Sequence, residues 1–207
     1  MKITRYFQSC LLIEDNNQRI LIDPSAEEAV NVGRFGQLAA VFYTHEHADH
    51  FDAALAKNFI GSNVPVYANA STAKLIGAQA NVVANGQTIK AGGFEIKVME
   101  LPHCLMTDGS AGPQNVGYLI NGKLFHPGDG KELAGLQVDV LAVPITGPDI
   151  SLREAFDFAK QVKAKTLIPI HYDFIGTKPE VFAYFGERFK SLFQIVIATH
   201  GQLLEIG

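Results

Sequence analysis

The sequence predicts an α/β fold on the strength of three features. Short apolar segments with strand-like composition recur along the chain, and segments with apolar residues at helical spacing lie between several of them. Clusters of His and Asp follow the ends of strands, where α/β sheets usually place their chemistry. No Pro/Gly/Ser-rich linker, internal repeat or block of charge divides the 207 residues, so we expect one domain spanning residues 1–207.

The N-terminal part of the chain predicts a hairpin followed by a buried strand. Residues 9–13 and 19–22 are apolar, and the polar residues 14–18 between them are expected to form a turn. Asp23 and Pro24 end the second of these strands. Residues 38–43 are rich in Ala, Val, Phe and Tyr, and they predict a buried strand that leads directly into a His/Asp cluster.

The rest of the chain predicts strands interspersed with two helices. The expected strands span residues 94–101, 116–120, 123–126, 138–143, 166–170 and 194–199. Ser151 and Glu154 form a capping box that starts a helix, and its expected buried stripe contains Leu152, Ala155, Phe156, Ala159 and Val162. A second helix is expected to begin within residues 177–180 and to bury Val181, Phe185 and Phe189, which recur at every fourth position.

The most informative segment is residues 45–50, which place three imidazoles and two carboxylates directly after a strand. Such groups suit zinc and its first-row neighbours. Alternate residues of an extended segment point the same way, so His45 and His47 could bind one ion, while Asp49 and His50 reach a second from the following turn. In the alternative, these side chains are solvated or cap the next helix.

Three further residues follow expected strands and could complete such a site. His103 comes after residues 94–101, Asp129 lies in a Gly-Asp pair after residues 123–126, and His171 ends residues 166–170. Alone, each would more often be a hydrogen-bonded core or loop residue. Two adjacent ions need about six or seven ligands. The three residues named here, together with the four ligand candidates of residues 45–50, would supply that number.

The pattern His-x-His-x-Asp-His, with Asp23-Pro24 upstream and His103, Asp129 and His171 downstream, resembles the metallo-β-lactamase superfamily. The resemblance implies a four-layer αββα sandwich, in which helices flank two mixed sheets. It implies that His45, His47 and His103 bind one metal ion, that Asp49, His50 and His171 bind a second, and that Asp129 bridges both. It also places Asp23 near the metals as a supporting residue, and His126 could support the site in the same way.

The resemblance implies a dinuclear metal-dependent hydrolase in which a metal-bridging hydroxide attacks a small phosphodiester or a lactone or ester, with Asp49 or Asp129 relaying the proton. Zinc is the expected metal, with manganese, iron and nickel as alternatives. An iron-dependent oxidoreductase acting on a persulfide or oxygen, and a non-catalytic metal-binding module, remain alternative functions.

Within the superfamily, the chain is most similar to the small branch that includes UlaG-like lactonases and other compact metal-dependent hydrolases. Residues 49–52 lack the Gly-Gly of glyoxalase II-like members, and His47 stands where flavo-diiron reductases carry Glu. Residues 146–149 depart from the Gly-Gly common in the branch, which leaves the substrate open.

Composition limits the classes of molecule that we expect the protein to bind. The net charge is −4 and no dense Lys/Arg cluster occurs, so nucleic acid is not an expected partner, whereas a small and even anionic molecule is compatible. No apolar run reaches the roughly 20 residues of a membrane span and no signal peptide is evident, so we expect a cytoplasmic protein, and a homo-oligomer remains open.

Several residues near the expected site are candidates for weaker roles. Met106, Thr107 and Ser110 lie in a polar loop after His103, and Tyr172 and Phe174 follow His171, so each could line a substrate pocket. Cys104 is expected to be a small buried side chain beside a ligand, and His200 a turn residue.

Overall fold

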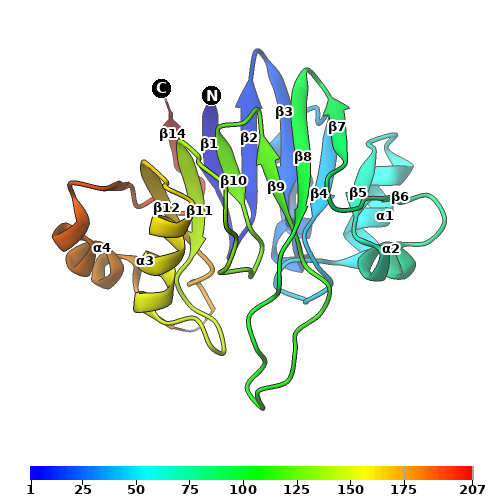
Figure 1. The fold of residues 1–207 in the computed structure, drawn as a ribbon. Coiled ribbons are helices and arrows are strands. Elements are labelled where there is room, and N and C mark those ends of the chain that lie inside the picture. Colours follow the sequence, from blue (N-terminus) through cyan, green and yellow to red (C-terminus); the bar gives the residue numbers. More distant parts are fainter. Residues whose placement is uncertain (175, 207) are drawn as a thin grey trace.

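In residues 1–174 and 176–206, which the computed structural model describes, two seven-stranded sheets pack face to face with helices on both outer sides (Figure 1). The four layers are arranged as helices, sheet, sheet and helices. This arrangement confirms the αββα sandwich expected from the sequence.

The first sheet is antiparallel on one side and parallel on the other. Its strands lie in the order β14 (Leu203–Glu205), β1 (Lys2–Arg5), β2 (Leu11–Asp15), β3 (Gln18–Ile22), β4 (Ala40–Tyr43), β5 (Val66–Ala68) and β6 (Asn81–Val82). Neighbours from β14 to β3 are antiparallel, and neighbours from β3 to β6 are parallel.

The second sheet repeats this division. Its order is β13 (Gln194–Ile195), β12 (Thr166–Ile170), β11 (Val140–Pro144), β10 (Leu124–His126), β9 (Val116–Ile120), β8 (Phe94–Glu100) and β7 (Thr88–Ala91). The strands from β10 to β13 are parallel, and those from β7 to β10 are antiparallel. The carboxyl ends of β3, β4, β10, β11 and β12 therefore meet at one edge of the sandwich, the lower edge in Figure 1.

Apolar side chains fill the spaces between the four layers. The inner faces of the two sheets share a core that includes Ile13, Phe42, Ile96, Tyr118 and Ile168. The 3-10 segment η1 (Ala26–Phe35) and the helices α1 (Ala53–Gly61) and α2 (Ala70–Ile76) belong to the first sheet's side, and α3 (Leu152–Gln161), α4 (Pro179–Gly186) and η2 (Glu187–Phe189) belong to the second's. None of the described helices is long and apolar enough to cross a membrane.

The first hairpin has a tighter turn than the sequence predicted. Asn16 and Asn17 both adopt positive φ angles of 48° and 61°, so they alone form the turn, and Asp15 pairs with Gln18. Asn tolerates this backbone conformation, and the two-residue turn matches the twist of the flanking strands. The expected strand at residues 194–199 is limited to β13.

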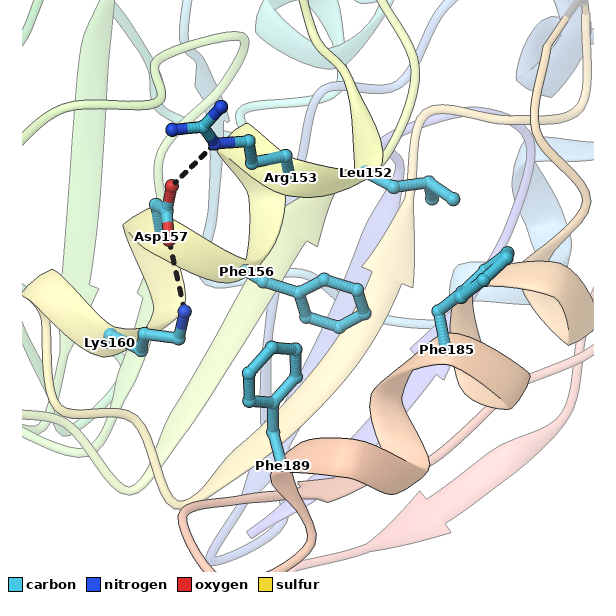
Figure 2. Close-up of a pocket in the computed structure, with 7 residues that line it drawn as sticks. All are labelled: Leu152, Arg153, Phe156, Asp157, Lys160, Phe185 and Phe189. Carbon is cyan, nitrogen blue, oxygen red and sulfur yellow. Dashed lines mark hydrogen bonds and ion pairs between the residues drawn. The ribbon is translucent and has the colours of Figure 1, made fainter.

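The capping box of α3 is confirmed, and Phe189 packs on Phe156 at 5.0 Å, but the expected burial of Val181 and Phe185 in α4 was wrong. Val181 and Phe185 are 42% and 40% exposed, whereas Phe182 is fully buried and its ring stacks on Phe156 at 4.4 Å. Figure 2 shows Phe185 and Phe189 on either side of a hollow beside α3. The helix packs through positions three and four residues apart, and a single repeat of four could not indicate which face that is.

Candidate metal centre

The structure brings the seven ligand-type side chains expected from the sequence to the edge where the parallel strands end. They form two groups, one of His45, His47, His103 and Asp129, and one of Asp49, His50 and His171. Within each group, the candidate ligand atoms lie within 4.8 Å of one another. The grouping has the same membership as the two ligand sets implied by the resemblance, with Asp129 in the first.

The backbone after β4 explains how one short segment contributes to both groups. His45 follows the end of β4, and a turn then forms in which the amides of His50 and Phe51 both donate to the carbonyl of His47, each at 2.9 Å. Asp52, rather than Asp49, caps α1 by accepting from the amide of Leu55 at 2.6 Å. Asp49 and His50 are thus free of a capping role.

Asp129 lies at the centre of the cluster. Its Oδ1 is 3.1 Å from Nε2 of His50, and its Oδ2 is 3.3 Å from Nε2 of His103 and 3.4 Å from Nε2 of His171. Its side chain is almost completely buried. One carboxylate therefore faces imidazoles of both groups, as a bridging ligand requires.

Four of the imidazoles are oriented through their Nδ1 atoms. Nδ1 of His50 lies 2.8 Å from Oδ2 of Asp23. Nδ1 of His103 lies 2.6 Å from the Cys104 carbonyl oxygen, and Nδ1 of His171 lies 2.7 Å from the Thr146 carbonyl oxygen. Nδ1 of His45 lies 3.0 Å from the Thr44 hydroxyl, which itself donates to Asp23. Because these partners accept, each Nδ1 carries a proton and holds its ring in place.

Several atoms that face the centre of the cluster make no hydrogen bond to the part of the protein that the structure describes. Nε2 of His45, His50 and His103 and Oδ1 of Asp129 are buried, and within the described residues none of them makes a hydrogen bond. Burying several lone-pair donors together without partners is costly. Bound cations would satisfy them, so the residues present fit divalent metal ions held by nitrogen and oxygen.

The electrostatics of the cluster keep its central carboxylate charged. Burial raises the pKa of Asp129, but His171 and His50 outweigh this effect and hold that pKa well below its ordinary value. Burial lowers the pKa of His50, but Asp129 and Asp23 outweigh it and raise the pKa of the imidazole. Burial and the neighbouring His50 both lower the pKa of His45. A charged Asp129 carboxylate beside the neutral imidazole of His45 favours a bound cation.

The two expected supporting residues occupy different positions. Asp23 is fully buried and accepts from the Thr44 amide, the Thr44 hydroxyl and Nδ1 of His50, at 2.7, 2.7 and 2.8 Å. His126 lies behind the loop that carries Asp129. Its Nε2 is 2.8 Å from the Ser9 carbonyl, and its Nδ1 accepts from the Gly128 amide at 3.2 Å. His126 therefore contacts the loop backbone and not the cluster.

Gln8 is a site residue that sequence reasoning missed. Its Oε1 accepts from the amides of Asp173 and Phe174 at 2.8 and 3.2 Å, and its Nε2 donates to Oδ2 of Asp49 at 3.1 Å. Because both backbone groups are donors, the orientation of the amide is determined. A lone Gln 41 residues before Asp49 carries no sequence signal of this contact.

A pocket of about 290 Å³, here called the inner pocket, opens above the cluster. Its lining includes Met106, Thr107 and Phe174, as expected, but Ser110 and Tyr172 do not line it. Cys104 is buried, and burial raises the pKa of its thiol to about 12, so it is an inert neighbour. His200 lies in a turn with its ring 5.5 Å from that of Tyr6, outside the cluster.

Comparisons with known proteins agree with the αββα layers and with the His/Asp cluster at their edge. The profile of the beta-lactamase superfamily domain matches residues 2–171. The chain is 32% identical to a UPF0173 protein of Pyrococcus furiosus over 88% of this chain and 89% of that one. It is 26% identical to a UPF0173 metal-dependent hydrolase of Alkaliphilus metalliredigens over 88% of this chain and 91% of that one.

Among solved structures, the fold matches Igni18, a metallo hydrolase of Ignicoccus hospitalis, with a TM-score of 0.78 and 21% identity over 100% of this chain and 99% of that one. The chain therefore belongs to the metallo-β-lactamase superfamily of metal-dependent hydrolases.

Proposed function

We propose that the protein is a dinuclear hydrolase that cleaves a small lactone or ester. The observation that carries the proposal is the set of buried imidazole nitrogens that converge on Asp129 from two ligand groups without hydrogen bonds to any described residue. His45, His47 and His103 would hold one ion, Asp49, His50 and His171 the other, and Asp129 both. Zinc is the proposed metal, since imidazole and carboxylate ligands suit it.

The bound ions would lower the pKa of water toward ~7 and polarise an oxygen of the substrate. The chain's own residues orient this chemistry. Gln8 and His171 both contact Oδ2 of Asp49, which fixes the orientation of the carboxylate. Asp49 is one-third exposed and lines the inner pocket, so a proton received there can pass to solvent or to the leaving group.

The lining of the inner pocket favours a carbonyl substrate over a phosphodiester. Met106, Pro148 and Phe174 supply apolar surface, and the described lining contains no Lys or Arg. The charge of a phosphodiester would be matched by the metal ions alone, whereas sites for such groups usually add cationic side chains. A lactone or ester needs only an apolar wall and polarisation of its carbonyl.

The first test is hydrolysis of a lactone, a carboxylic ester, a thioester and a phosphodiester by the zinc-loaded protein. Asp129→Asn preserves the shape of the side chain but weakens its bridging charge, so we expect activity on the lactone or ester to fall at least about 100-fold. His200→Ala, remote from the cluster, serves as the control and should retain full activity.

Equal rates for the wild type and Asp129→Asn on every substrate would overturn the hydrolase proposal. The same preparations should be analysed for iron and assayed for oxygen and persulfide consumption, which distinguishes the oxidoreductase alternative. Zinc binding without turnover of any kind would instead support a non-catalytic module.

A further inference from the structure

Phe174 stands between two pockets. Its side chain is 72% exposed, and it lines both the inner pocket and a second pocket of about 370 Å³. This outer pocket is formed by Phe7, Ser25, Ala26, Glu27 and Ala48, and it shares Asp49 as well as Phe174 with the inner one. The two pockets are therefore neighbours on either side of the Phe174 side chain, and the candidate metal ligand Asp49 lines both of them.

The backbone of Phe174 is tied to the same residue that holds Asp49. The Phe174 amide donates to Oε1 of Gln8, whose Nε2 donates to Asp49. The carboxylate of the preceding residue, Asp173, accepts hydrogen bonds from Nη1 and Nη2 of buried Arg5, at 2.6 and 2.9 Å. The backbone that presents the exposed ring is consequently fixed relative to the cluster, as a specificity wall requires.

The outer pocket combines apolar walls with negative charge. Phe7, Ala26, Ala48 and Phe174 contribute apolar surface, Glu27 is exposed, and no Lys or Arg belongs to the described lining. The basic residues of the surrounding segments are already paired, Arg5 with Asp173 and Arg34 with Glu28. Such a surface accepts an apolar group that is neutral or cationic and repels an anion.

We propose that the outer pocket is a second substrate subsite, which binds the group across the scissile bond from the one held above the cluster. That group is apolar, and neutral or cationic. Phe174 and Glu27 determine this specificity. The proposal rests on the hydrolase function proposed above. Water supplies hydroxyl to the acyl carbon and a proton to the leaving alcohol as the C–O bond breaks, so no further reactant is needed.

Three acetate esters of similar size test the charge preference: those of 3,3-dimethylbutanol, choline and 2-hydroxyethanesulfonate. We expect the neutral and cationic esters to have the higher kcat/KM. Glu27→Lys should lower kcat/KM for the choline ester and raise it for the sulfonate ester, each by about twofold to fivefold, as for one partly exposed charge. Glu95→Lys makes the same charge change in β8, away from both pockets, and should change neither value.

A second measurement detects binding to the proposed subsite and does not depend on catalysis. The chain contains no Trp, so Phe174→Trp introduces a single Trp, which can be excited selectively, between the two pockets. Its emission should shift saturably on titration with 3,3-dimethylbutanol or choline, but not with 2-hydroxyethanesulfonate. Tyr184→Trp, on the 75% exposed position of α4, is the matched control and should not respond.

Identical responses from the two Trp variants, or equal effects of Glu27→Lys and Glu95→Lys on all esters, would refute the subsite. Absence of hydrolysis of these esters and of every substrate tested above, with a selective Phe174→Trp response, would refute the hydrolase function and leave the ligand site standing. The two proposals can therefore fail independently.

Discussion

Gln8 shows how a single uncharged side chain can organise a ligand and a pocket wall together. Gln8 is only 2% exposed, and both ends of its side-chain amide make hydrogen bonds, one with Asp49 and the other with the backbone after His171. His171 itself has a φ of 62°, an uncommon conformation for a residue with a side chain, and its amide donates to the Gln8 carbonyl. Such strain persists only where neighbouring contacts impose it.

Replacing Gln8 by Glu should weaken metal binding by the group of Asp49, His50 and His171. The new carboxylate would keep its contacts to the backbone amides but would face Oδ2 of Asp49 at the 3.1 Å now spanned by a hydrogen bond. We expect an affinity loss of about 10–100-fold, typical of lost support for a ligand. Titration against a chromogenic chelator measures it, with exposed Gln37→Glu as the control. Unchanged affinity in Gln8→Glu would show that Asp49 is held by other contacts.

Gly112 supports His103 because it has no side chain. A Cβ at this position would lie 2.2 Å from Nδ1 of His103 and 2.9 Å from the Cys104 carbonyl, the two atoms that hydrogen-bond each other. Gly112→Ala should therefore displace the imidazole and lower the affinity of the His45, His47, His103 and Asp129 group by about tenfold or more. Gly61→Ala, where nothing lies within 4 Å, should leave metal binding intact. Equal affinities in the two variants would contradict this role.

Sequence reasoning found residues of distinctive chemistry and missed residues that act only by position. Imidazoles and carboxylates at strand ends stand out in a sequence, and the structure gathers all seven. Gln8 and Gly112 have no such signature, because their roles depend on contacts across 41 residues for Gln8 and on a close approach to His103 for Gly112. Only the packed chain reveals these contacts.

Among the connecting elements, the loop between β8 and β9 is tethered by one aspartate. Asp149 accepts from the Leu105 amide at 3.1 Å, and its other oxygen lies 2.9 Å from Nζ of Lys131. The tether joins the loop that carries His103 and Met106 to the turn before α3. The position of the inner pocket's wall therefore depends on it.

Asp149→Ala should release this loop. We expect faster amide hydrogen exchange in residues 104–112 and a loss of about 1–2 kcal/mol in the free energy of unfolding, because one tethering side chain and one ion pair are lost. Asp157→Ala removes exposed ion pairs on α3 and should cost less than about 0.5 kcal/mol, with unchanged exchange in the loop. Protection in the loop that survives Asp149→Ala would rule out the tether.

Element prediction succeeded where local pattern decides and failed where packing decides. The capping box at Ser151 and the apolar run of β12 are local signals, and both elements begin where predicted. The buried face of α4 depends on which turn meets Phe156, and the length of the first hairpin depends on pairing across the sheet. Neither is encoded in a short stretch of sequence.

At the scale of the whole molecule, the two ligand groups connect the two sheets. His45, His47, Asp49 and His50 follow β4 of the first sheet, whereas His103, Asp129 and His171 follow strands of the second. Each group draws on both sheets. Metal ions bound there would link the halves of the sandwich, in addition to the apolar core between them.

Metal binding should therefore stabilise the entire fold against unfolding. An ion at a hundred times its Kd adds about 2.7 kcal/mol, which for a chain of this size raises Tm by about 5–10 °C. Differential scanning calorimetry of the zinc-loaded and chelator-treated protein measures the shift. His200→Ala should show the full increase and Asp129→Asn a much smaller one, because only the latter alters the centre of the cluster. A Tm that is the same with zinc and with chelator would mean that zinc does not bind the folded protein in preference to the unfolded chain.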